Sequence, residues 1–370
     1  MPSQRFEKSA MPRLPLLTSL RFLAALEVVI FHCGNEFIGL LASPAQMFFL
    51  HGYEAVSFFF VLSGFVLAYA YHSPSRRSSS VVHWSYYRAR LIRIYPVYVL
   101  GLLLATPIFY WSSVVKQTTD PTVAVAALGL VPLLLQAWNP PTALAWNAPA
   151  WSLSVEAAFY AVFPWLSMTF FAHPGAARAA ALVVLVCGTE CIRIYLLACG
   201  ATDAFVYFFP IFHAPTFLCG VAVAHLYLRH APSTKVANLL FYGAATALVT
   251  LWTSTVPRSW ASSNIVLVPL YSILILGATR CTGVFARVLS SRVLTILGDA
   301  SYALYILHMP LHFWWGRLKL VMLPDPAYDA VWAIAFLPVV ISVSVLTFFY
   351  LEDPIRRATR PACAVGRAEH

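Results

Sequence analysis

Long apolar runs follow one another along most of this chain, separated by short polar or basic segments. The hydrocarbon core of a bilayer is about 30 Å thick, so a helix needs about 20 mostly apolar residues to cross it. Ten runs have roughly that length, and they predict an all-α, polytopic integral membrane protein. The predicted membrane-spanning helices cover residues 16–34, 50–71, 94–112, 151–171, 179–199, 204–228, 237–256, 264–281, 300–316 and 328–351.

An eleventh apolar run, residues 123–138, is shorter and is interrupted by Pro132. The positions of Lys and Arg decide whether it crosses, because cytoplasmic loops of membrane proteins are enriched in these residues. With a cytoplasmic N-terminus and 123–138 excluded, 18 of the 24 Lys and Arg residues fall on the cytoplasmic side. If 123–138 crossed, every later loop would change side and the asymmetry would be lost. We therefore expect ten transmembrane helices, cytoplasmic ends at 1–15 and 352–370, and an outer-side re-entrant or interfacial segment at 123–138.

The composition supports a membrane protein. Of the 370 residues, 60% are hydrophobic and only 10% are charged, whereas soluble domains have about 25% charged residues. No charge-poor but soluble-looking stretch is long enough for a second domain, so we expect one membrane domain over 1–370 without an appended soluble domain. The net charge of +10 follows from the predicted topology, so nucleic-acid binding is not needed to explain it. The seven cysteines are scattered and form no zinc-type or disulfide framework.

The first apolar run carries three ionisable residues, Arg21, Glu27 and His32. Such groups inside a membrane span are costly and rare, so they indicate a functional site. Arg21 and His32 are eleven residues apart, which places them on one helix face and about 16 Å apart along the axis. The structural alternative is that Arg21 extends to the interface and His32 caps the outer end.

Two further places combine polar groups with apolar runs. The segment RARLIRIYPVY places Arg90 and Arg93 on one helix face at the cytoplasmic surface, where guanidinium groups suit either lipid headgroups or a phosphate-bearing cofactor. Glu156 lies about one turn inside the span that starts at Trp151, which we interpret as an interface aromatic. That carboxylate suits a substrate hydroxyl, or an ion pair with Arg21 or His32.

Two other polar pairs in the apolar runs are not assigned to a functional site. Glu190 and Arg193, three apart, are expected to form a pair within one helix. His308 and His312 have the spacing of metal ligands, but Pro310 lies between them and no third ligand is evident, so no metal site is predicted. The sequence also lacks a nucleophile elbow, a phosphate-binding loop, a dinucleotide fingerprint and a zinc-protease motif.

Two classes of function fit these residues. One is a transporter of glycans or lipids that uses Arg21, His32 and Glu156 as a relay. The other is a transferase that performs acid–base chemistry inside the bilayer.

The ordered motifs decide between them, because they resemble the membrane-bound acyltransferase 3 family of the O-antigen acetylase type over nearly the whole chain. They are R-F-L-A-A…F-H (Arg21 to His32), FFVLSGF (Phe59 to Phe65), R-x-x-R-I-Y-P (Arg90 to Pro96), W-S-L-S-V-E…F-Y (Trp151 to Tyr160), L-G-D-A-S-Y-A-L-Y-I-L-H-x-P (Leu297 to Pro310) and E-x-P-x-R (Glu352 to Arg356). Each motif is weak alone. Six in this order are specific.

The resemblance implies an enzyme of the bacterial inner membrane. It would transfer an acyl group, usually acetyl, from acyl-CoA to a hydroxyl of a glycan, a lipid-linked sugar or a small molecule. His32 matches the essential histidine of the family and Arg21 its partner arginine, with Glu156 expected to orient His32 or the acceptor. Arg90, Arg93 and Tyr95 are the expected cofactor-binding residues. The chain departs from the family at Ser57, where many members have an acidic residue.

Overall fold

The structure is a computed structural model that describes residues 12–71, 81–170, 176–254 and 264–359. These residues form helices joined by short connections, without any β-strand in the described ranges. The long helices are α1 (Pro15–Cys33), α4 (Ala55–Tyr71), α5 (Val81–Tyr110), α7 (Trp151–Phe170), α8 (Ala176–Ala198), α10 (Ala214–Arg229), α11 (Thr234–Thr253), α13 (Asn264–Ala278), α16 (Ser301–Met322) and α17 (Asp329–Thr347). The shorter helices and turns include α2 (Asn35–Ile38), α3 (Ser43–Leu50), η1 (Gly52–Glu54), η3 (Trp111–Val115), α6 (Pro121–Leu130), η4 (Gln136–Trp138), α9 (Asp203–Phe208), η7 (Pro210–His213), α14 (Val284–Leu289), α15 (Arg292–Asp299), η9 (Phe348–Glu352) and α18 (Asp353–Ala358).

The all-α prediction is confirmed for the described residues, and each of the ten predicted spans overlaps a long helix. Seven helical segments are both long and apolar enough to cross a membrane. They are Pro15–Cys33, Ser43–Tyr71, Trp84–Val115, Arg178–Ala198, Pro210–Arg229, Thr234–Thr253 and Pro326–Ala358. The protein is therefore multi-pass, while the count of ten spans remains a prediction.

Helix α5 begins well before the predicted start at residue 94. It starts at Val81, so the basic stretch that holds Arg90 and Arg93 is already helical. Hydropathy missed this first part because its polar residues lower the apolar content without breaking the helix. The remainder of the predicted basic loop, with Arg76 and Arg77, lies outside the described residues, as do most of the predicted cytoplasmic ends.

The 123–138 region does not form one continuous helix. α6 ends at Leu130, and the chain then turns through Leu134, whose φ is 58°, before η4. At the other end of α6, the carboxylate of Asp120 accepts a hydrogen bond from the backbone N–H of Thr122 at 2.8 Å, which is a typical N-cap. A short helix followed by a tight turn is compatible with the predicted outer-side excursion, and the re-entrant assignment stays a prediction.

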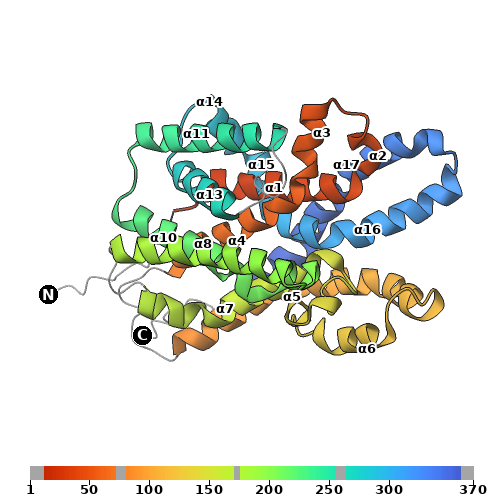
Figure 1. The fold of residues 1–370 in the computed structure, drawn as a ribbon. Coiled ribbons are helices and arrows are strands. Elements are labelled where there is room, and N and C mark those ends of the chain that lie inside the picture. Colours follow the sequence, from red (N-terminus) through yellow and green to blue (C-terminus); the bar gives the residue numbers. More distant parts are fainter. Residues whose placement is uncertain (1–11, 72–80, 171–175, 255–263, 360–370) are drawn as a thin grey trace, which may run out of the picture.

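Helices α1 and α4 lie at the centre of the bundle, with α11 and α13 on one side and α5 and α7 on the other (Figure 1). The FFVLSGF motif brings α4 and α10 unusually close. A Cβ atom on Gly64 would lie 2.1 Å from the carbonyl oxygen of Phe217, and one on Gly220 would lie 1.8 Å from that of Val61. Small residues allow such backbone contact between membrane helices, and Gly64 and Gly220 provide it here.

Candidate active site

A polar cavity of about 130 Å³ lies in the middle of the bundle, where α1, α4, α5, α7 and α16 meet. Its charged lining consists of Arg21, Arg90, Arg93 and Glu156. These four residues are far apart in the sequence, and all four were singled out from the sequence. We refer to this space as the central cavity.

Two of the three arginines in the central cavity lack a carboxylate partner within the described part of the chain. Arg21 forms no ion pair there, and neither does Arg90. The Arg90 guanidinium instead lies 5.8 Å and 5.7 Å from the ring centroids of Tyr71 and Tyr160, and its buried Nε has no hydrogen-bond partner among the described residues. Cation–π contacts compensate a guanidinium only partly, so the cavity keeps positive charge available for an anion.

The third arginine of the cavity is paired. Arg93 forms an ion pair with Glu352, whose side chain is fully buried, and Arg356 lies 3.5 Å from the same carboxylate oxygen. The Arg93 guanidinium also lies 5.6 Å from the ring centroid of Tyr302. This pairing joins the R-x-x-R-I-Y-P and E-x-P-x-R motifs, which are more than 250 residues apart and whose contact the sequence analysis did not predict.

Glu156 is held by hydroxyl groups. The hydroxyl of Ser63 donates to its Oε1 at 2.7 Å, and Tyr160 donates to the same oxygen. Neither Arg21 nor His32, the partners considered from the sequence, forms an ion pair or a hydrogen bond with this carboxylate.

His32 does not line the central cavity. It lies in the last turn of α1, and its Nδ1 is 3.3 Å from Nε2 of His308. The ring centroids are 5.2 Å apart at an interplanar angle of 29°, a separation that suits two imidazoles meeting edge to edge. The sequence analysis considered His308 only as a metal ligand, and the structure makes it the partner of His32.

The surroundings of His308 fix which nitrogen carries its proton. Its Nδ1 lies 2.7 Å from the carbonyl oxygen of Tyr305, and a carbonyl can only accept, so Nδ1 donates. Nε2 of His308 then carries the lone pair and accepts from Nδ1–H of His32. In this tautomer Nε2 of His32 carries the lone pair. Tyr305 links the histidines to the central cavity, because it lines that cavity and its ring centroid lies 6.0 Å from that of His308.

Two residues lie elsewhere than expected. Tyr95 does not line the central cavity, and its hydroxyl donates to the carbonyl oxygen of Pro132 at 3.0 Å. Trp151 is only 6% exposed and contacts the rings of Tyr207, Phe208 and His213. The interpretation of Trp151 as an interface aromatic is therefore wrong, because a position at a span's end does not reveal whether neighbouring helices cover it.

No group of three or more potential metal ligands occurs among the described residues. The sequence analysis did not assign His308 and Glu352 to the site, although both residues lie in the motifs. His308 lies in the L-G-D-A-S-Y-A-L-Y-I-L-H-x-P motif, and Glu352 opens E-x-P-x-R. What the motifs could not supply was the pairing between helices.

Comparisons with known proteins give the family of this chain. A family model described as an acyltransferase domain matches residues 16–350. The chain is 40% identical over 161 residues to the acyltransferase MdmB of Streptomyces mycarofaciens, a match that covers 41% of this chain and 38% of that protein. It is 23% identical over 373 residues to the O-acetyltransferase OatA of Staphylococcus aureus, covering 96% of this chain and 59% of that protein.

A third relative, described as protein 2 in the picA locus of Rhizobium radiobacter, is 35% identical over 166 residues, covering 41% of this chain and 81% of that protein. The chain thus matches less than two thirds of the length of MdmB and OatA. No solved structure matches this chain.

Proposed function

This chain belongs to the acyltransferase family whose model covers residues 16–350, and from that premise we propose that it transfers an acetyl group from acetyl-CoA to a hydroxyl of a glycan or lipid-linked sugar. The observation that carries the proposal is the central cavity, in which Arg21 and Arg90 have no carboxylate partner. The name of OatA, an O-acetyltransferase, supports an acetyl group and an oxygen acceptor. No observation favours a transporter.

The donor would enter from the cytoplasmic side. Coenzyme A carries several phosphate charges, and guanidinium groups bind phosphates through charge-assisted hydrogen bonds. In the proposed topology α1 and α5 both start on the cytoplasmic side, and Arg21, Arg90 and Arg93 all line the central cavity. Arg90 and Arg93 would hold the phosphates, while Arg21 would contact the pantetheine arm or thioester. Tyr95 is left out of this donor site because its hydroxyl is bonded to Pro132.

His32 would act as the general base. Its Nε2 accepts the proton of the acceptor hydroxyl, whose oxygen attacks the thioester carbonyl. A C–O bond forms, the C–S bond breaks, and the coenzyme A thiolate leaves and is then protonated. His308 is a positioning residue in this scheme, since it holds His32 in the required tautomer. Glu156 orients the groups near the reacting carbonyl through Ser63 and Tyr160.

The positive-inside pattern and the family support a location in a bacterial plasma membrane with both termini cytoplasmic. The acceptor would then be reached from the outer side, and the acyl group would cross most of the bilayer inside the protein.

The test supplies membranes carrying the wild type or His32→Ala with radiolabelled acetyl-CoA, followed by extraction of glycan, lipid and protein. We expect label in glycan or lipid with the wild type and a loss of about 10²–10⁴-fold in the variant. His230→Ala, at the exposed end of α10, is the control and should retain activity. Substantial transfer by stably inserted His32→Ala would overturn the assignment of the base.

A further inference from the structure

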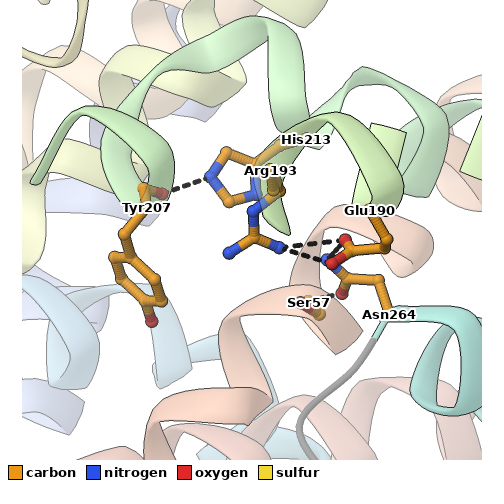
Figure 2. Close-up of polar contacts among 6 residues, drawn as sticks. All are labelled: Ser57, Glu190, Arg193, Tyr207, His213 and Asn264. Carbon is orange, nitrogen blue, oxygen red and sulfur yellow. Dashed lines mark hydrogen bonds and ion pairs between the residues drawn. The ribbon is translucent and has the colours of Figure 1, made fainter. Parts of the chain in front are cut away.

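A second, smaller cavity of about 30 Å³ lies where η1, α4, α7, α8, α9, η7 and α13 approach one another. We refer to it as the Arg193 pocket. Figure 2 shows Arg193 between Tyr207 and His213 on one side and Glu190 and Asn264 on the other. In the proposed topology every helix that contributes to this pocket does so at its outer end.

The charge of Arg193 is compensated. Its Nη1 donates to both carboxylate oxygens of Glu190, at 2.9 and 3.1 Å. Asn264 donates to Oε1 of Glu190 at 2.7 Å, and Ser57 donates to the side-chain oxygen of Asn264 at 3.0 Å. This chain of bonds fixes the Arg193 guanidinium and leaves no net charge on the pair, so the pocket does not call for an anion.

Nδ1 of His213 and Nε of Arg193 are buried atoms of the pocket without a partner among the described residues. The Glu54 carboxylate also lines the pocket, and its Oε2 accepts a hydrogen bond from the indole N–H of Trp252 at 2.9 Å. His213 is 5% exposed, and its Nε2 lies 2.7 Å from the carbonyl oxygen of Tyr207. Nε2 must therefore carry the proton, which leaves a lone pair on Nδ1. His213 and Arg193 thus offer one acceptor and one donor, the pair that a single hydroxyl group satisfies. Leaving such groups unpaired costs about 1–3 kcal/mol each.

The walls and the size of the pocket limit what this hydroxyl belongs to. The rings of Trp151 and Tyr207 lie 5.3 Å apart beside the polar groups, and ligand sites typically combine apolar walls with a few placed polar atoms. A volume of 30 Å³ holds about two water-sized groups. It therefore takes one hydroxyl and the carbon that bears it, with the rest of the ligand outside.

We propose that the Arg193 pocket binds a hydroxyl of a neutral sugar and so holds the acceptor of the transfer reaction. This inference rests on the proposed function. The position of the Arg193 pocket also supports the inference, because Val56 lines both this pocket and the central cavity. The proposed acceptor and donor sites are therefore neighbours in the bundle. His213 and Arg193 position the hydroxyl through Nδ1 and Nε.

The experiment uses the purified full chain in lipid nanodiscs and measures thermal unfolding. The probes are methyl α-D-glucopyranoside, methyl β-N-acetylglucosaminide and acetyl-CoA. We expect each sugar to raise the unfolding temperature of the wild type, and His213→Phe to weaken sugar binding at least tenfold while leaving the acetyl-CoA response unchanged. His230→Phe, the same substitution at the exposed end of α10, should behave like the wild type.

A second measurement does not depend on the folding of His213→Phe. Ser57→Cys is nearly isosteric, and modification of its thiol by methyl methanethiosulfonate is followed by peptide mass. We expect the sugars to slow this modification several-fold and acetyl-CoA to leave it unchanged.

The outcomes separate the two proposals. If neither sugar stabilises the wild type or protects the Ser57→Cys thiol while acetyl-CoA stabilises it, the pocket holds ordered water only and the acceptor assignment is overturned. If the sugars bind equally well to the wild type and His213→Phe, the acceptor site lies elsewhere. If acetyl-CoA has no effect but the sugars act as expected, the donor part of the proposed function fails and the Arg193 pocket stands.

Discussion

The central cavity and the Arg193 pocket share Val56 in their linings but differ in that only the cavity has arginines without a carboxylate partner among the described residues. In the cavity, Arg21 and Arg90 have no carboxylate partner within the described residues. In the pocket, Arg193 is bound by both oxygens of Glu190. A cation without a partner recruits an anion, whereas a compensated one serves as a fixed hydrogen-bond donor. The contrast matches an anionic donor and a neutral acceptor.

The largest expected effect comes from removing the carboxylate that pairs with Arg93 of the central cavity. Glu352→Gln leaves Arg93 buried without its ion-pair partner, and such a loss costs about 3–5 kcal/mol. Thermal unfolding in nanodiscs should show a large drop in unfolding temperature. Asp353→Asn is the matched control, because its partner Arg357 is 74% exposed and a surface pair contributes about 0–1 kcal/mol. Equal effects at the two positions would mean that the Arg93 pair is not buried in the folded protein.

The next effect tests whether α4 and α10 hold the two sites in register. Gly64→Ala would place a Cβ atom 2.1 Å from the carbonyl oxygen of Phe217, which forces the helices apart at a cost of about 1–3 kcal/mol. Both acetyl-CoA and sugar binding should weaken, together with a lower unfolding temperature. Gly243→Ala, where a Cβ would meet nothing within 4 Å, should be neutral. A loss of only one ligand would show that the sites are positioned independently.

Arg90→Ala should affect the donor alone. A hydrogen bond to a charged group contributes about 1.5–3 kcal/mol, so the KM for acetyl-CoA should rise about tenfold to a hundredfold. Sugar binding should stay as in the wild type, and steady-state kinetics with both substrates varied would measure this. Arg357→Ala removes an exposed arginine and serves as control. If instead the acceptor KM rises, the contrast between the two sites is wrong.

The smallest effect concerns the histidine pair. His308→Asn removes the acceptor that holds His32 in one tautomer, and a neutral hydrogen bond of about 0.5–1.5 kcal/mol implies a loss of kcat of up to about tenfold. The pH dependence of kcat should change while both KM values stay constant. His230→Asn, at the exposed end of α10, is the control. An unchanged pH profile in His308→Asn would assign His308 a packing role only.

The sequence revealed the residues of the cavity better than their partners. Arg21, Arg90, Arg93 and Glu156 were visible because a charge in an apolar run is costly and therefore conspicuous. The His32–His308 contact joins residues 276 apart, and no periodicity within one helix encodes it. The ion pair between Arg93 and Glu352 also joins distant residues, and no periodicity within one helix encodes it. The interpretation of Trp151 as an interface aromatic was wrong for a related reason, because burial by other helices is a tertiary property.

The fold, like the site, could be predicted only where the residues of a single helix decide it. Hydropathy located all ten long helices, since each overlaps a predicted span, but it placed the start of α5 too late because a basic helix and a basic loop have the same composition. The path of residues 123–138 depended on where α6 ends, which is set by the turn at Leu134. Ser57, the departure from the family pattern, donates to Asn264, and this partner comes from a helix some 200 residues away.

The shared position of Val56 also bears on how the membrane stays sealed. In the proposed topology the central cavity takes the donor from the cytoplasmic side and the Arg193 pocket lies toward the outer side, with the apolar side chain of Val56 in the lining of both. An apolar constriction at this position would resist hydrated ions, because they would have to shed their water to pass. The enzyme could thus hand a small acyl group across the bilayer without dissipating the proton gradient. Val56→Ala should then increase proton leakage into liposomes at a stage where transferase activity is still retained.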